Sequence, residues 1–314
     1  MRETIRPFDF ADQSAVVKLL SEAMPAEAIS ESRFVRQVML DANFRPAGAP
    51  VAVREGKVIG FCLSIARRVP LENAPPDSDR GYITLFAVTP EAQRHGMGTK
   101  LLAAAEEYLK AQGRSACMIA SYAPGYFIPG VDVSAYAGAL EFLKHSGYAE
   151  VYRPIAMRTR LAEVRVPQWV HERREKLSAA ATVIEPYAPA LTTPLLEFVQ
   201  REFPGDWVRV VKEAMGAILL GASPARLFIA RQGNNILGFS QFCNDRFGPI
   251  GVSSSQRGRG VGQVLMFETL AAQRDAGFAS AYFLWSDDKT AERLYNAAGF
   301  KEFRRFALMK KSLA

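Results

Sequence analysis

The chain has 314 residues, of which 49% are hydrophobic and 23% charged. This is ordinary for a soluble globular protein and is enough for two domains with separate cores. No stretch approaches the about 18 apolar residues of a membrane span, and the N-terminal segment has no apolar signal core. We therefore expect a cytoplasmic protein without a membrane anchor.

The net charge of +7 divides into +2 for residues 1–161 and +5 for the remainder, and the basic residues form only short pairs. This dispersion favours a solvated surface over a nucleic-acid-binding face. The three cysteines, Cys62, Cys117 and Cys243, lie far apart in apolar stretches. We expect buried thiols, with neither a disulfide framework nor a metal site.

The first half predicts a regular series of elements. Helical patterns cover 13–23 and 30–41, a hairpin covers 50–66 and turns at Glu55-Gly56, and a strand covers 82–88. A glycine-rich turn then leads into a helix at 97–112 that ends at Gly113, followed by a strand at 116–121. The Pro/Gly-rich stretch "YAPGYFIPGVDVS" predicts a loop, whose "YFIPGVD" part (126–132) we expect to project over a cleft; a helix ending at Gly147 and a last strand follow.

Residues 162–180 predict a charged linker helix, with Trp169 packing between domains, and the second domain begins at about 181. The boundaries are therefore 1–161, 162–180 and 181–314.

The second half predicts the same series. Helical patterns at 191–202 and 206–220 precede a hairpin at 226–242 with Gly-Asn-Asn at its turn, and a strand follows at 248–252. A glycine-rich turn opens a helix at 261–276, and then come a strand at 280–286, a helix ending at Gly299 and a last strand.

The two halves align as one repeated unit. A shift of 164 residues places Gly96 on Gly260 and Gly98 on Gly262, while "EFLKHSGY" (141–148) matches "RLYNAAGF" (293–300) at a shift of 152. Strands alternating with helices in each copy predict an α/β fold with a mixed sheet.

A strand that passes through a glycine turn into a helix presents unpaired amides, which with the helix dipole favour an anion. Arg257 and Arg259 add positive charge in the second copy, as do Arg94 and His95 in the first. The pattern predicts a diphosphate cradle in each copy, and the alternative is an ordinary tight turn. Neither copy contains the P-loop pattern or the G-x-G-x-x-G of dinucleotide folds.

The hexapeptides "QRHGMG" (93–98) and "RGRGVG" (257–262), each after a strand and before a helix, resemble the acetyl-CoA motif of the GCN5-related N-acetyltransferases, the GNAT superfamily. "LYNAAGF" (294–300) is similar to a second motif of that family. The chain resembles tandem two-domain bacterial members. The resemblance implies two tandem GNAT-like domains, each a mixed, mostly antiparallel sheet flanked by helices.

The resemblance also implies the residues that bind acetyl-CoA, which is a co-substrate in this family. The backbone of the strand ends would pair with the pantetheine arm, and the turns would hold the diphosphate. These residues are Phe86, Ala87, Val88, Gln93, Arg94, His95, Gly96, Met97, Gly98 and Thr99 in the first copy, and Ile250, Gly251, Val252, Arg257, Gly258, Arg259, Gly260, Val261, Gly262 and Gln263 in the second.

For catalysis, the resemblance implies that Tyr295 protonates the leaving sulfur, and the alternative is a core aromatic at a helix end. The first copy has Leu143 at this position; Tyr122, Tyr126 and Tyr136 are possible substitutes. Asp287 or Asp288 is interpreted as a helix N-cap ahead of a general base, and Asp245 is a further candidate base.

We therefore expect an N-acetyltransferase that moves an acetyl group to a primary amine of a small molecule by direct attack in a ternary complex, with the C-terminal domain favoured as the active one. An amino sugar is one candidate acceptor. The alternative is that one or both domains are non-catalytic CoA-binding sensor or scaffold modules. We expect no nucleic-acid partner, and either a monomer with pseudo-dimeric domains or a homodimer.

Overall fold

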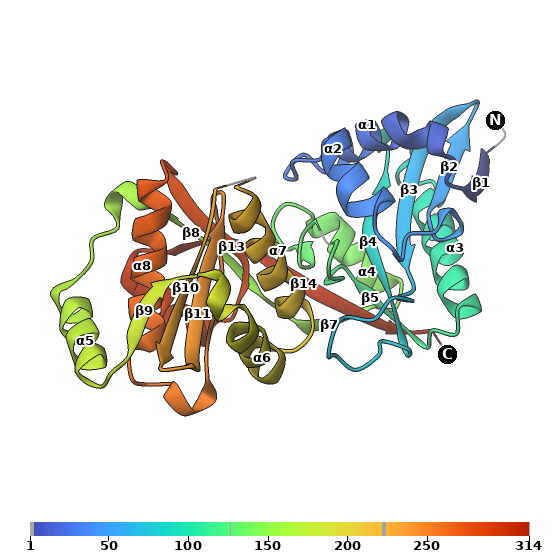
Figure 1. Cartoon of the computed structure of the whole chain (residues 1–314). Helices are drawn as coiled ribbons and strands as arrows, with labels where there is room; N and C mark the ends of the chain where they lie inside the picture. Colours follow the sequence, from blue (N-terminus) through green and yellow to red (C-terminus); the bar gives the residue numbers. More distant parts are fainter. Residues whose placement is uncertain (1–2, 126, 222–223, 314) are drawn as a thin grey trace. The chain divides into compact units, whose positions relative to one another are not determined.

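The computed structural model describes residues 3–125, 127–221 and 224–313 (Figure 1). The chain divides into two compact units. Unit 1 comprises Met1–Pro70, Pro75–Pro154 and Arg305–Ala314, and unit 2 comprises Leu71–Ala74 and Ile155–Arg304.

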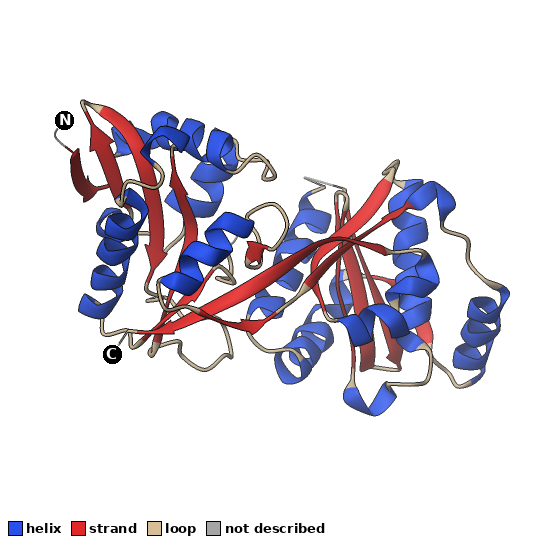
Figure 2. Ribbon diagram, turned by 180° about the vertical axis from the view of Figure 1, so that it is seen from behind, coloured by secondary structure: helices blue, strands red, loops and turns tan. Residues whose placement is uncertain are grey.

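Unit 1 is a mixed sheet flanked by helices (Figure 2). Its strands are β1 (Glu3–Pro7), β2 (Pro50–Arg54), β3 (Lys57–Ile65), β4 (Arg80–Val88), β5 (Ala116–Ile119), β6 (Val131–Asp132), β7 (Ala149–Tyr152) and the last part of β14 (Lys301–Ser312). Its helices are α1 (Gln13–Ala23), α2 (Glu31–Phe34), α3 (Met97–Ala111) and α4 (Ala137–His145). The order β1-β2-β3-β4-β5-β14 is antiparallel except for the β4–β5 pair.

Helices cover both faces of the unit 1 sheet because side chains alternate along its strands. Phe61 on β3 packs on Phe34 of α2, at 6.1 Å between ring centroids. The next residue, Cys62, belongs to the buried cluster that contains Leu101 and Leu109 of α3. The sheet is therefore a central layer between α1 and α2 on one face and α3 on the other.

Unit 2 repeats this architecture. Its strands are β8 (Ile155–Arg160), β9 (Val183–Pro186), β10 (Ala225–Gln232), β11 (Asn235–Cys243), β12 (Arg246–Val252), β13 (Ser280–Ser286) and the first part of β14. Its helices are α5 (Gln168–Ala179), α6 (Thr192–Glu202), α7 (Asp206–Leu220), α8 (Val261–Asp275) and α9 (Asp288–Arg293). The strand order is β9-β10-β11-β12-β13-β8, and only β12 and β13 are parallel.

Side chains that alternate along β10 again pack on helices at the two faces of the sheet. Leu227 and Ile229 belong to the cluster beneath α6 and α7, whereas Phe228 and Ala230 belong to the cluster beneath α8. The predicted fold class is confirmed: two α/β GNAT-type domains, each with a mostly antiparallel sheet flanked by helices.

The two repeats exchange their closing strands. β8, which follows the first copy in sequence, pairs with β13 of unit 2, and Arg160 lies opposite Ser280. The equivalent part of β14 pairs with β5 of unit 1, and Ser312 lies opposite Ala116. These two residue pairs correspond under the sequence repeat, so the exchange is reciprocal and in the same register.

This exchange corrects the sequence boundaries. Residues 155–161 belong to unit 2 although they lie inside the predicted first domain 1–161, and residues 305–314 belong to unit 1 although they lie inside 181–314. The segment 162–180 does contain a helix, α5, but it is part of unit 2. Strand pairing is non-local, so a boundary drawn along the sequence misses it.

Most predicted helices and strands lie where the patterns place them, and one helix and one cysteine differ from the prediction. The predicted helix 30–41 is a short α2 followed by a π-helical turn at Val35–Met39. Cys62 and Cys117 are buried, but Cys243 is only partly buried. Burial raises the pKa of Cys117 to about 12, so this thiol stays protonated at neutral pH.

Candidate coenzyme and catalytic sites

In each unit two neighbouring parallel strands separate. In unit 1, β4 pairs with β5 only from Arg80 to Ile83. The chain then turns away because Ala120 and Ser121 both adopt left-handed backbone conformations, with φ of 58° and 55°. In unit 2 the separation comes earlier, since Arg246 opposite Tyr282 is the one parallel pair between the described parts of β12 and β13.

Among the described residues, the separation leaves the last part of β4 and of β12 without a neighbouring strand on one side. The end of β4 pairs on one side with β3, where Val88 lies opposite Gly60, and the end of β12 pairs with β11, where Val252 lies opposite Gly238. The predicted pantetheine-pairing residues, Phe86 to Val88 and Ile250 to Val252, lie at these edges. An unpaired edge can accept an extended ligand as an added strand.

The glycine turn of unit 1 opens directly into α3. Gly96 is the N-cap with a left-handed φ of 81°, and the N–H of Lys100 donates to its carbonyl at 3.1 Å. Because Lys100 makes the first helical bond, the amides of Met97, Gly98 and Thr99 have no partner within the helix. The predicted diphosphate cradle would use these three N–H groups.

Unit 2 has the same construction at α8. Gly260 is the N-cap with φ of 88°, and the N–H of Val264 donates to its carbonyl at 3.1 Å. The amides of Val261, Gly262 and Gln263 are left over in the same way. The two glycine turns thus have the same backbone geometry.

The side chains around the two cradles differ. In unit 1, Gln93 is used structurally, since its amide donates to the carbonyl of Val88 at 3.0 Å, while Arg94 and His95 are exposed. In unit 2, Arg257 is exposed and Arg259 donates to the side chain of Gln256 at 2.9 Å.

A helix outside the repeat also reaches the unit 2 cradle. Arg173 of α5 donates to the Oε1 atom of Gln263, and a Cβ placed at Gly260 would lie 2.8 Å from the Arg173 Cδ. At Gly96, no described atom lies within 4 Å of the equivalent point. Arg173 is not among the residues predicted from the sequence. The one pattern that points to it is that Val170, Arg173 and Leu177 share a helix face.

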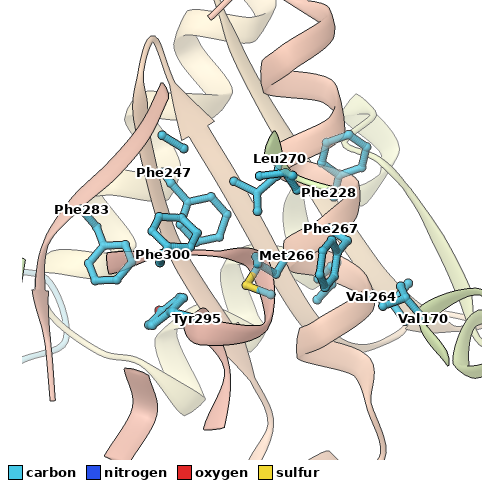
Figure 3. Close-up of a cluster of buried hydrophobic side chains, with 14 of the residues drawn as sticks. Val170, Phe228, Phe247, Val264, Met266, Phe267, Leu270, Phe283, Tyr295 and Phe300 are labelled. Atoms are coloured by element: carbon cyan, nitrogen blue, oxygen red, sulfur yellow. The ribbon is translucent and has the colours of Figure 1, made fainter. Parts of the chain in front are cut away.

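Tyr295 begins the short 3-10 turn after α9 (Figure 3). Its ring is 4.4 Å from that of Phe283 on β13 and 6.3 Å from that of Phe247 on β12, and only 8% of the residue is exposed. It therefore lies between the strands that separate. None of the hydrogen bonds among the described residues involves its hydroxyl. Burial, with a smaller contribution from the charge of Asp287, raises the pKa of Tyr295 far above its usual value.

Unit 1 has an apolar side chain at this place. Leu143 is 4% exposed and lies in the core cluster beneath α3. Beside it, the ring of Phe142 stacks on Phe86 at 5.7 Å. The sequence patterns gave no sign of this stack, because its two residues lie in separate elements.

The other tyrosines of unit 1 are engaged elsewhere. The Tyr122 hydroxyl accepts from Asn43 at 2.7 Å and donates to Asp41 at 3.1 Å, and the Tyr136 hydroxyl donates to Glu27 at 3.3 Å. Tyr126 lies outside the described residues.

The expectation of a loop projecting over the first cleft is wrong for the described residues 127–132. Phe127 and Ile128 are 1% and 6% exposed, and Arg33 of α2 stacks on the Phe127 ring at 4.4 Å. The loop is thus packed into unit 1, because burial of its apolar side chains lowers the free energy relative to exposure to water.

The two candidate carboxylates Asp287 and Asp245 lie in different places. Asp287 is the N-cap of α9, where its carboxylate accepts from the Thr290 N–H at 2.8 Å, so the capping interpretation is confirmed. Asp245 is exposed in the turn before β12, at the end of the strand away from the cradle. Its role as a general base stays a prediction from the sequence.

A shallow hollow of about 340 Å³ opens beside α9 in unit 2. Of the candidates named from the sequence, Asp288 lines it, whereas Tyr295 and the predicted coenzyme-binding residues do not. The lining residues are Ile155, Met157, Asp288, Ala291, Glu292, Asn296, Phe300, Lys301 and Glu302.

The described residues lack two features. They contain no group of three or more His, Cys, Asp or Glu side chains placed to hold a metal ion. None of their helices is long and apolar enough to cross a membrane.

Two family models match the chain. The model described as the acetyltransferase (GNAT) family matches residues 14–124, and the model described as the acetyltransferase (GNAT) domain matches residues 223–302. Each match contains one glycine turn and its helix. The chain is a tandem two-domain member of the GNAT superfamily.

Solved structures with the same fold span almost the whole chain. A glucosamine N-acetyltransferase region of a fungal multi-domain GH3 β-N-acetylglucosaminidase matches with a TM-score of 0.81 at 20% identity, covering 98% of this chain but only 38% of the fungal one. A GCN5-related N-acetyltransferase from Sphaerobacter thermophilus matches with a TM-score of 0.73 at 18% identity, covering 99% and 96% of the two chains.

A tandem GNAT protein from the clavulanic acid biosynthesis pathway matches with a TM-score of 0.66 at 15% identity, covering 100% of this chain and 99% of the other. No curated protein matches the sequence. At these identities the structures establish the shared fold.

Proposed function

We propose that the protein is an acetyl-CoA-dependent N-acetyltransferase with a small-molecule amine acceptor, and that unit 2 carries the turnover. The observation that carries this proposal is the position of Tyr295. Its ring contacts both β12 and β13 where they separate, and its hydroxyl is unpaired among the described residues.

The residues present fit the coenzyme. Three leftover amides at the start of α8 and the open edge of β12 offer donors for a diphosphate and for an extended amide chain. Acetyl-CoA supplies the acetyl group as a thioester. A neutral amine attacks its carbonyl, and a backbone amide of the open β12 edge stabilises the developing oxyanion.

Tyr295 acts as the general acid of this mechanism. The phenol is protonated at neutral pH, since burial only raises a pKa that ordinarily lies near 10. As the C–S bond breaks, the amine nitrogen releases a proton, and the phenol donates its own proton to the sulfur. A buried phenol without another partner loses no existing hydrogen bond when it does so.

Unit 1 favours the second function, coenzyme binding without turnover. It has a cradle at α3, but it carries Leu143 where unit 2 has a phenol, and its Tyr122 and Tyr136 hydroxyls are already bonded. We propose that this unit holds CoA as a sensor or scaffold module.

Glucosamine and related amino sugars are the first acceptors to test. The fungal region named above is described as a glucosamine N-acetyltransferase. Because its identity to this chain is 20%, the acceptor is carried here as a proposal.

The test is thiol release from acetyl-CoA over a panel of amines, in the wild type and in two variants at equivalent positions. Tyr295→Phe should lower kcat by about 10²-fold, the usual size of a general-acid contribution, with CoA affinity retained. Leu143→Tyr is the matched variant of unit 1.

Three outcomes decide between the functions. An unchanged rate in Tyr295→Phe removes Tyr295 from the mechanism. Binding of CoA without acetylation of any amine assigns both units to the sensor class. A gain of activity in Leu143→Tyr would show that unit 1 lacks only the acid.

A further inference from the structure

Helix α5 is held firmly against α8 by its own side chains. The ring of Trp169 meets that of Phe267 edge-on at 5.9 Å, and Val170 and Leu177 are buried in the same cluster. Arg174 pairs with Glu268 of α8. Trp169 therefore packs on Phe267 within unit 2, to which α5 itself belongs.

This docking puts Arg173 at the start of α8. Its side chain covers Gly260, where an added Cβ would lie 2.8 Å from Cδ and 3.5 Å from both Cγ and Nε. The guanidinium donates to the side-chain oxygen of Gln263, and the backbone N–H of Gln263 is one of the three amides of the cradle. The side chain thus lies at the place where the diphosphate is proposed to bind.

The charge of Arg173 is not neutralised. Its partners are the neutral amide oxygen of Gln263 and the Trp169 ring, 4.4 Å from its Cζ. The neighbouring Arg174, by contrast, has Glu268. Among the described residues, no carboxylate pairs with Arg173, Arg257 or Arg259. The start of α8 thus has Arg173 packed over Gly260 and two further arginines in the preceding turn, which is a set of charges suited to a phosphate group.

We propose that Arg173, supplied by α5, is a phosphate-binding residue of the unit 2 coenzyme site, and that the described residues of unit 1 hold no counterpart at Gly96. The inference rests on the proposed function, since it assumes that the cradle binds CoA. When CoA binds, the Arg173 guanidinium replaces its hydrogen bond to the Gln263 oxygen with one to a diphosphate oxygen. Its aliphatic stem on Gly260 and its contact with the Trp169 ring keep it near the cradle. Arginine suits this role because its planar fork bonds phosphate with two N–H groups.

The test measures CoA binding by calorimetry in the full chain. A Gly98→Asp background places a carboxylate in the unit 1 cradle, so the remaining heat reports unit 2. Arg173→Met keeps an apolar stem over Gly260 but removes the charge. Arg174→Met is the matched control on the same helix.

We expect Arg173→Met to weaken CoA binding about tenfold or more, as for the loss of a charge-assisted bond. Arg173→Lys should recover part of the loss, and Arg174→Met should stay within about twofold of the wild type. Acetyl-pantetheine, which has no phosphate, should bind all four proteins alike. This last comparison separates phosphate binding from a structural effect of undocking α5.

Equal CoA affinity in Arg173→Met and Arg174→Met would overturn the inference. Tighter binding in Arg173→Met would also overturn it, because Arg173 would then obstruct the cradle. These results leave the proposed function intact, whereas absence of any CoA heat in the wild type would remove the proposed function itself.

Discussion

The two units carry the same cradle in different surroundings. In unit 1 the space over Gly96 is open, but a Phe86–Phe142 stack lies beside the separated strands and Leu143 replaces the phenol. In unit 2 a cation from α5 covers Gly260, and Tyr295 lies between the separated strands. The two copies thus share the local backbone geometry, while the side chains around it differ.

The largest expected effect comes from placing a carboxylate in each cradle in turn. The helix dipole stabilises a negative side chain in the first turn of a helix, so the Gly98→Asp and Gly262→Asp variants should fold. Each new carboxylate should repel a diphosphate. Each variant should lose one of two bound CoA molecules, and turnover should fall about 10²-fold more in Gly262→Asp than in Gly98→Asp. Similar losses of turnover in both would mean that the units are catalytically equivalent.

The next effect concerns how β14 is held in unit 1. Lys311 donates to both carboxylate oxygens of Glu106 on α3, at 2.8 and 2.9 Å, and the Tyr148 hydroxyl donates to the same carboxylate. Lys311→Met should lower the free energy of unfolding by about 2 kcal/mol, because a mostly buried carboxylate loses its cation. Urea denaturation measures this change.

Unit 2 supplies the control for this variant. Its equivalent positions are Thr159 and Leu270, and the Thr159 hydroxyl donates to the carbonyl of Ala298 at 3.0 Å. Adding Glu106→Leu to Lys311→Met should therefore recover much of the lost stability. A double variant as unstable as the sum of the two single ones would argue that the pair is not coupled.

A smaller effect is expected at the start of α9. Asp287→Ala should cost about 1 kcal/mol at pH 7, the usual size of an N-cap. The Thr290 N–H bond holds the pKa of Asp287 below its ordinary value, so the cap contributes stability above the unfolded-state pKa and loses it as the pH falls through the folded-state pKa. The gap to the wild type in urea denaturation should therefore shrink below about pH 4. Asp287→Asn, which caps without titrating, should keep its stability in that range.

The smallest effect tests one residue of the turn. Arg94 has a left-handed φ of 62°, and the equivalent Gly258 has 80°. Arg94→Gly should increase the free energy of unfolding by roughly 0.5 kcal/mol and so raise the melting temperature slightly. Glycine removes the steric penalty of the left-handed conformation, and this gain is partly offset by the larger entropy that glycine loses on folding. Gly258→Arg should do the reverse, and a destabilised Arg94→Gly would show that the arginine side chain contributes more than its backbone costs.

The sequence reveals the features that depend on neighbouring residues. The hairpins, the glycine turns and the helices after them follow from local apolar periodicity and from glycine at the helix starts. The N-cap of α9 follows in the same way from the Asp287–Thr290 spacing.

Features that depend on distant partners were missed. Residues 155–160 and 307–312 have the same pattern, so either segment suits β5 or β13, and the pattern does not specify which pair forms. The position of Arg173 depends on how α5 docks, which a charged helix sequence does not reveal. Burial of Phe127 depends likewise on α2, which lies about ninety residues earlier in the sequence.

The exchanged strands make each repeat dependent on the other for its completion. A fragment cut between the copies would leave β5 and β13 with bare edges, and such edges invite aggregation. Loss or rearrangement of one repeat during evolution is therefore penalised at the level of folding, even where that repeat performs no chemistry. A module with a lost activity would be kept because its neighbour cannot close without it.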